Sequence, residues 1–124
     1  AWTRDNVGRN QWMLSRLEAR MAAYPEKRQV LVTHMLPIKD FTVPKEMANW
    51  AYFNAFLGSR KLGELYRRYP VTAAVCGHVH YRRSLDQDGI HWMCRCLNYH
   101  TEWRPQDGET VRDQIENSVE VLDL

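Results

Sequence analysis

The chain has 124 residues, of which 44% are hydrophobic and 26% are charged, and its formal net charge at pH 7 is +2. These values fit one globular domain and exclude a collagen-like, disordered or disulfide-framework protein. The small net charge argues against nucleic acid or an anionic membrane as a partner. Its apolar runs are far shorter than the ~20 residues of a membrane span, and no signal-peptide pattern is visible. We therefore expect a cytoplasmic protein without a membrane span.

The first half of the chain predicts a helix, a strand and a second, longer helix. Apolar residues recur at helical spacing over residues 10–23. Residues 29–33 form a short β-branched run without polar alternation, which is typical of a strand that is buried on both faces. A loop follows, and residues 48–69 again have helical spacing, although Gly58 and Gly63 weaken the middle of that helix.

The second half predicts a buried strand, a hairpin and a final edge strand. Residues 71–76 are continuously apolar, and an Asp88-Gly89 turn joins the two predicted strands of a hairpin, residues 81–85 and 90–97. Residues 118–124 alternate apolar and acidic side chains. The order helix, strand, helix, strand, hairpin, strand predicts an α/β fold with parallel pairing.

Three of the five histidines come directly after the two buried strands. His34 follows the first strand, and His78 and His80 follow the second strand after Gly77. Ligands of α/β sheets bind beyond the carboxyl ends of the strands, where these side chains meet. Neutral imidazole is the commonest protein ligand for a divalent transition metal. The placement therefore predicts a metal site made by His34, His78 and His80.

Two segments around these histidines also carry a family resemblance. Val-Leu-Val-Thr-His-Met-Leu-Pro at residues 30–37, followed later by Val-Cys-Gly-His-Val-His at 75–80, resembles the last two motifs of the calcineurin-like metallophosphoesterase superfamily. The stretch Gly-His-Val-His-Tyr-Arg-Arg at 77–83 is also similar to the purple acid phosphatase branch. The resemblance implies the back half of a metallophosphoesterase β-sandwich flanked by helices.

The same resemblance implies a function and a ligand set. The family hydrolyses phosphoesters, as phosphatases or phosphodiesterases, with two divalent ions that can be Mn, Fe, Zn or Co. Carried over to this chain, His34 and His78 share one ion and His80 binds its neighbour. The substrate is then a phosphoester, held at a two-metal site of which this chain supplies the C-terminal histidines.

The motifs that open a domain of this family are missing from the chain. It contains no Asp-x-His, no Gly-Asp and no Gly-Asn. The resemblance thus implies that residues 1–124 are the C-terminal portion of a domain whose N-terminal half is absent. We expect the 124-residue chain alone to be inactive. We also expect it to self-associate, because an unpaired sheet edge and an uncovered apolar face promote association.

Other residues have less specific interpretations. Arg82 follows the histidine motif and is a candidate contact for a substrate phosphate, although a solvated strand arginine explains it as well. Trp12 and Trp50 lie near helical apolar stripes and are predicted core residues. The three cysteines are interpreted as small buried residues in a reducing compartment.

A second function of another class fits part of the sequence. The chain can be a non-catalytic α/β binding module for nucleic acid or a protein partner, with incidental histidines. A nucleic-acid-binding domain has clustered basic residues and a pI above about 9. Here the charges are dispersed and the sequence pI is about 8.5, so the hydrolase interpretation is favoured.

Overall fold

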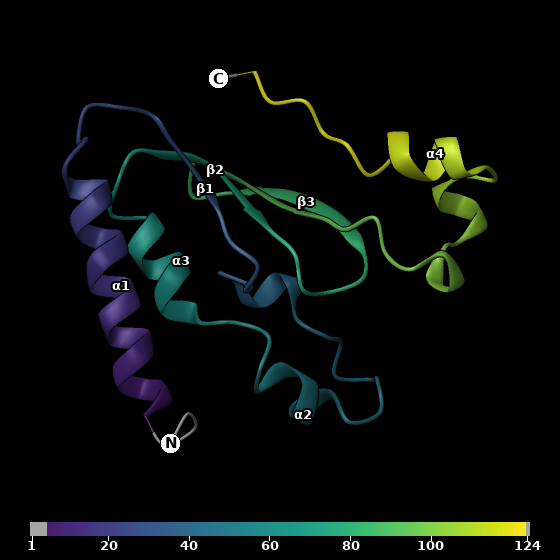
Figure 1. The fold of residues 1–124 in the computed structure, drawn as a ribbon, viewed down its shortest axis with the longest axis horizontal. Coiled ribbons are helices and arrows are strands. Elements are labelled where there is room, and N and C mark those ends of the chain that lie inside the picture. Colours follow the sequence, from purple (N-terminus) through teal and green to yellow (C-terminus); the bar gives the residue numbers. More distant parts are fainter. Residues whose placement is uncertain (1–4, 124) are drawn as a thin grey trace.

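The fold is built around one four-stranded sheet, seen in a computed structural model that describes residues 5–123 (Figure 1). The strands are β1 (Gln29–Val32), β2 (Val71–Cys76), β3 (Arg82–Gln87) and β4 (Ile90–Arg95). Their order in the sheet is β1-β2-β4-β3, with β1, β2 and β4 parallel and β3 antiparallel to β4. The predicted α/β class is confirmed. Residues 5–123 contain this one sheet, so they do not by themselves form the expected β-sandwich.

Two helices lie side by side next to the sheet (Figure 1). Helix α1 spans Asn6–Ala22 and α3 spans Arg60–Tyr66, and both contribute to the same hydrophobic core. Helix α1 begins earlier than its apolar spacing predicts, because the Asp5 carboxylate accepts a hydrogen bond of 2.8 Å from the Gly8 amide and so caps the helix. Within the described part of the chain, no helix has the length and apolarity to cross a bilayer.

The predicted long helix over residues 48–69 is wrong, because two short helices occupy that segment. Helix α2 spans Trp50–Asn54 and ends well before α3. Between them Gly58 forms an isolated parallel bridge with Leu36, on the chain that leaves β1. A Cβ on Gly58 would lie 2.0 Å from the Leu36 carbonyl oxygen, so only glycine permits this approach. The contact holds the segment after His34 against the start of α3.

The hairpin is confirmed and the last strand is not. Asp88 and Gly89 both have positive φ, 55° and 74°, as a two-residue type I′ hairpin turn requires. Residues 117–123 form no strand, and helix α4 (Val111–Glu116) precedes them. A capping box between Thr110 and Asp113 starts this helix. Residue 124 of the predicted strand lies outside the described residues.

Strand β1 is an edge strand with one uncovered face. Val30 and Val32 are 37% and 74% exposed, so the prediction that this strand is buried on both faces is wrong. Leu31, on the opposite face, packs against the core instead. The predicted self-association depends on this apolar edge and stays a prediction. Trp12 and Trp50 are also exposed, at 62% and 39%, which corrects their assignment to the core.

The C-terminal tail is held to the sheet by a charged cluster. The Glu120 carboxylate binds the His91 ring (Nε2 to Oε1, 2.6 Å) and Ser84 (Oγ to Oε2, 2.8 Å), and it pairs with Arg95. The other His91 ring nitrogen lies 2.7 Å from Asp86 Oδ1. Hydrogen bonds to Asp86 and to Glu120 raise the pKa of His91 above its usual range. This cluster explains why Glu120 anchors the tail without strand pairing.

We expect the His91 contribution to stability to depend on pH. The pKa of His91 is higher in the folded chain than in the unfolded chain, where it is about 6.5, so protonated His91 stabilises the fold. This stabilisation is complete below pH 6.5 and is lost as the pH rises through the pKa of His91 in the folded chain. His91→Asn should therefore lower the free energy of unfolding most at pH 6, and the difference from wild type should shrink towards pH 8.5. Urea unfolding at both pH values measures it. The exposed-histidine control His100→Asn should keep the wild-type pH dependence, and a constant His91→Asn difference across this range would contradict the prediction.

Candidate functional site

Two of the three predicted histidines meet at the carboxyl edge of the parallel strands. His34 Nε2 lies 2.8 Å from His78 Nδ1, and the ring centroids are 4.7 Å apart in an edge-to-face arrangement. His34 follows the end of β1 and His78 follows the end of β2, which pair directly in parallel register. The parallel topology therefore brings together residues that are 44 positions apart in sequence.

The turn after β2 aims the His78 ring at His34. His78 has φ 70°, a left-handed conformation that is uncommon for a residue with a side chain but enriched in histidine. The preceding Gly77 amide donates to the His34 carbonyl oxygen at 3.3 Å. A Cβ on Gly77 would lie 3.5 Å from the His34 ring, so the backbone approaches that ring closely. Strained backbone of this kind concentrates at functional sites.

The third histidine, His80, has different neighbours. Its Nδ1 lies 2.8 Å from Glu102 Oε2, and its ring packs edge-to-face against Tyr99, with centroids 5.0 Å apart. Glu102 comes from the short helix His100–Glu102. When Nδ1–H donates to this carboxylate, the lone pair of His80 Nε2 is left available to a ligand or a proton.

The geometry of the His34–His78 pair fits part of a metal site. Two imidazole nitrogens bound to one ion at 2.0–2.1 Å lie about 2.9 Å apart at an octahedral angle near 90°, and about 3.3 Å apart at a tetrahedral angle. The observed separation of 2.8 Å is that of a hydrogen bond between the two rings, and it is close to the octahedral value. No group of three or more histidine, cysteine or acidic side chains placed to hold a metal occurs among residues 5–123. The pair could supply at most two ligands, and His80 does not join it in this arrangement.

The Cys94 thiol near the site is protonated. Cys76 and Cys94 are buried, and the Cys94 and Cys96 sulfurs are 3.9 Å apart. Hydrogen bonding to Cys76, together with burial, raises the pKa of Cys94 to about 12. A thiol with this pKa is protonated at neutral pH and is neither a nucleophile nor a ready metal ligand.

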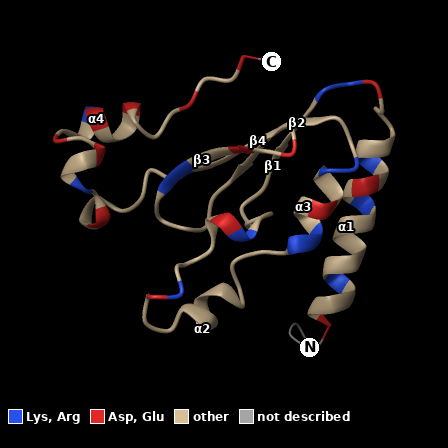
Figure 2. Cartoon of the chain, turned by 180° about the vertical axis from the view of Figure 1, so that it is seen from behind, with Lys and Arg blue, Asp and Glu red and all other residues tan. Residues whose placement is uncertain are grey.

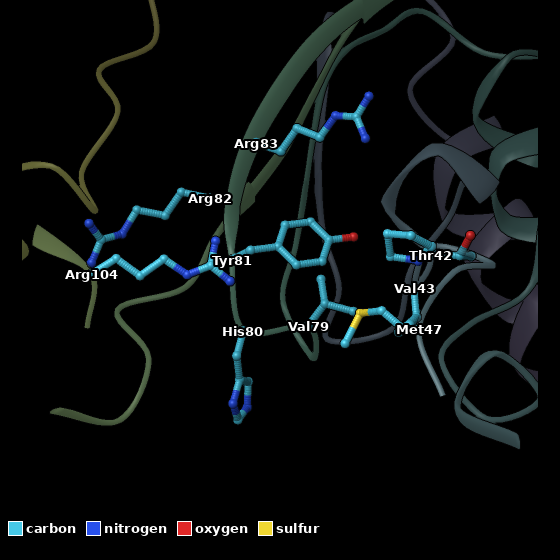
Figure 3. Close-up of a pocket in the computed structure, with 10 residues that line it drawn as sticks. Thr42, Val43, Met47, Val79, His80, Tyr81, Arg82, Arg83 and Arg104 are labelled. Carbon is cyan, nitrogen blue, oxygen red and sulfur yellow. The ribbon is translucent and has the colours of Figure 1, made fainter. Parts of the chain in front are cut away.

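The predicted substrate contact, Arg82, is held by the C-terminal part of the chain. Its guanidinium donates to the Cys96 carbonyl (3.1 Å), the Leu97 carbonyl (3.3 Å) and Gln114 Oε1 (3.0 Å). In Figure 3 its side chain runs away from Tyr81, toward that part of the chain. These bonds engage Arg82 in holding the structure together, and its contact with a substrate stays a prediction.

Two cavities border the histidines. A cavity of about 470 Å³, lined mostly by apolar side chains of α1 and by the residues around Gly58, includes His34 in its wall. A second cavity, of about 440 Å³, includes His80 and three arginines, Arg82, Arg83 and Arg104 (Figure 3). Both volumes lie in the range of small-molecule sites.

Sequence reasoning missed two residues beside the histidine motif. Glu102 contacts His80, and Arg104 lines the same cavity, although both are more than twenty positions further along the chain. Glu102 and Arg104 belong to no sequence motif, and the apolar residues of the loop that carries them do not recur at helix or strand spacing. Only the chain path after β4 brings them to the site.

Comparisons with known proteins show the fold. No family model and no curated protein matches the sequence. The crystal structure of phosphopantetheinyl hydrolase from Mycobacterium tuberculosis is similar, with a TM-score of 0.60 and 24% sequence identity. The match covers 83% of this chain and 37% of that one, so this chain spans well under half the length of its structural neighbour.

These findings correct the family identification made from the sequence motifs. The structural neighbour is described as a phosphopantetheinyl hydrolase, and no family model supports membership of the calcineurin-like metallophosphoesterases or of their purple acid phosphatase branch. That identification is withdrawn. The motifs are too short to assign a family, and the argument for a metal now depends on the geometry of His34 and His78 alone.

Proposed function

We propose that this chain carries part of the active site of a metal-dependent hydrolase acting on a phosphoester. The observation that carries the proposal is the contact of His34 Nε2 with His78 Nδ1, at 2.8 Å, beyond the ends of two parallel strands. Ligand sites in open α/β sheets form at this edge. The name of the similar structure, a phosphopantetheinyl hydrolase, supports hydrolysis as the reaction class.

In this proposal His34 and His78 hold one divalent ion through the two facing nitrogens. A bound divalent ion neutralises charge on phosphoryl oxygens and lowers the pKa of water. The reaction joins a water oxygen to phosphorus, breaks the bond from phosphorus to the leaving oxygen, and delivers a proton to that oxygen. The Gly77–His34 backbone bond keeps the two imidazoles close together, and an ion that binds them would replace the proton they share.

His80 has the geometry of an oriented imidazole in the same turn. Its hydrogen bond to Glu102 fixes the ring and favours the tautomer with a free Nε2. We assign His80 Nε2 to a neighbouring ion or to a proton of the reacting groups. Both roles need the free nitrogen, and both are lost when the ring is removed.

The proposal predicts selective metal binding by the histidine pair. Titrating Mn²⁺ into the isotope-labelled chain should broaden the ring signals of His34 and His78 first, because the paramagnetic ion relaxes the nearest nuclei. His34→Ala should weaken the affinity for the metal by more than about tenfold. Even the loss of a residue that only hydrogen-bonds to a metal ligand lowers metal affinity by about 10–100-fold. Isothermal titration with Zn²⁺ measures the same change without broadening.

The matched control is His100→Ala, which removes an exposed histidine outside the pair. This variant should bind either metal like the wild-type chain. Equal affinity in the His34→Ala variant and the wild-type chain would contradict the proposed site, as would broadening centred on His91 or His100.

A further inference from the structure

The cavity beside His80 is formed by three separate segments (Figure 3). One wall is the loop that includes Thr42, Val43 and Met47, and another is the turn and strand start at residues 79–83. Arg104, which precedes the short helix Pro105–Asp107, completes it. The volume of about 440 Å³ is enough for a small organic ligand.

The arginines of this cavity are not neutralised by carboxylates. Arg83 Nη1 donates to the backbone carbonyl of Asp40 at 2.9 Å, and Arg82 donates to carbonyls and to the Gln114 amide oxygen. The guanidinium of Arg104 has no partner among residues 5–123. By contrast, Arg67, Arg68, Arg95 and Arg112 all form ion pairs. The start of β3 is visible as a basic stretch of the ribbon (Figure 2).

The two arginines that flank Tyr81 differ in where their guanidinium groups lie. In Figure 3 the Arg104 side chain extends toward Tyr81, and the Arg83 side chain leaves the strand on the other side of that ring. Arg83 donates to the Asp40 carbonyl, so Arg104 is the arginine whose guanidinium is left for a ligand. Guanidinium groups bind phosphate through paired N–H donors, and they do so most strongly where no carboxylate competes.

The remaining wall of the cavity is apolar. Val79 is buried, and Val43 and Met47 face the same space. Tyr81 closes the floor, with its hydroxyl hydrogen-bonded to the Phe41 carbonyl. Burial raises the pKa of Tyr81, so this phenol remains neutral and does not repel an anion. A ligand that fits the cavity therefore combines an anionic group with an apolar body.

We infer that this cavity is a binding site for a phosphate group carried on an apolar organic body, with Arg104 holding the phosphate and Val43, Met47 and Val79 contacting the body. As a substrate site this rests on the proposed function. His78 and His80 are two residues apart, at most about 7 Å along the backbone.

The test is an NMR titration of the 124-residue chain without metal, once with inorganic phosphate and once with phenyl phosphate. Both should shift signals of Arg104 and Val79. Phenyl phosphate should bind about fivefold more tightly, because the ring covers apolar surface of the cavity. Arg104→Gln should weaken both ligands by about tenfold or more, because a charge-assisted bond is lost. Arg104→Lys keeps the charge and should recover part of the affinity.

Two matched variants complete the design. Arg112→Gln removes an exposed arginine of α4 outside the cavity and should leave both affinities unchanged. Met47→Gln should weaken phenyl phosphate only. Equal affinities in Arg104→Gln and Arg112→Gln would overturn the inference, and equal binding of the two ligands would overturn the apolar half of it. Because no metal is present, failure here leaves the His34–His78 proposal standing, and loss of metal binding leaves this site standing.

Discussion

Replacing His78 by alanine is expected to lower phosphoester hydrolysis by about a hundredfold or more. The His78 imidazole supplies one of the two ring nitrogens that meet at the sheet edge, where the ion is proposed to bind. A bound divalent ion stabilises the transition state of phosphoester hydrolysis by several kcal/mol. Hydrolysis of p-nitrophenyl phosphate and of its bis ester, measured with Mn²⁺ on a protein that joins this chain to a segment supplying the remaining ligands, checks this. The 124-residue chain alone should show no turnover, because two imidazoles are an incomplete ligand set for a metal-activated water.

The backbone at His78 needs its own control. At φ 70° alanine is strained, so a loss of activity in His78→Ala can come from a distorted turn. His78→Gly removes the same imidazole and suits this conformation. Both variants should lose activity, while His78→Gly should unfold at the wild-type urea concentration or above it. Activity retained in His78→Gly would show that the ring does not take part in the reaction.

The His34–His78 contact could be predicted because it follows from topology. Two buried strands with histidines at their ends predict parallel neighbours, and parallel strands place their carboxyl ends on one edge. The structure pairs β1 with β2 and the two rings meet. The contact of His80 with Glu102 could not be predicted, because it depends on how an irregular loop returns to the sheet.

The errors in the fold have tertiary causes. Residues 48–69 do form helix on both sides of Gly58, as their apolar spacing predicts. At Gly58 itself the backbone pairs with Leu36, and a residue inside a helix cannot make this contact because its backbone groups bond within the helix. The alternation of residues 118–124 is typical of an edge strand. In the structure Glu120 pairs with His91 and Arg95, and these side-chain bonds replace the backbone ladder.

A second large effect is expected at Trp92, which is fully buried on β4. Its ring stacks with that of Tyr66 of α3, with centroids 6.1 Å apart and planes 14° from parallel. Its Nε1–H donates to the Gln87 carbonyl at 3.0 Å, and the Arg67 guanidinium lies 5.1 Å from the ring centroid. Trp92 therefore joins the helix layer to the sheet and also ties β4 to β3.

Trp92→Ala should lower the free energy of unfolding by about 3–5 kcal/mol, because removal of a buried aromatic ring leaves a cavity that the core fills only in part. This is a large fraction of the 5–15 kcal/mol that typically separates a folded domain from its unfolded chain. Urea unfolding followed by far-UV circular dichroism measures it, since loss of the buried ring changes the midpoint more than the slope.

Trp12→Ala is the matched control, because Trp12 is 62% exposed on α1, where the Arg16 guanidinium lies 5.1 Å from its ring centroid. It should cost about 1 kcal/mol or less. Similar losses of stability in the two variants would contradict the conclusion that Trp92 is a central core residue.

The Trp92→Ala substitution should also affect the histidine pair, because Trp92 pairs in register with Ala74 of β2. A loosened β4 leaves β2 and its turn less supported, so Trp92→Ala should also weaken metal binding by the His34–His78 pair.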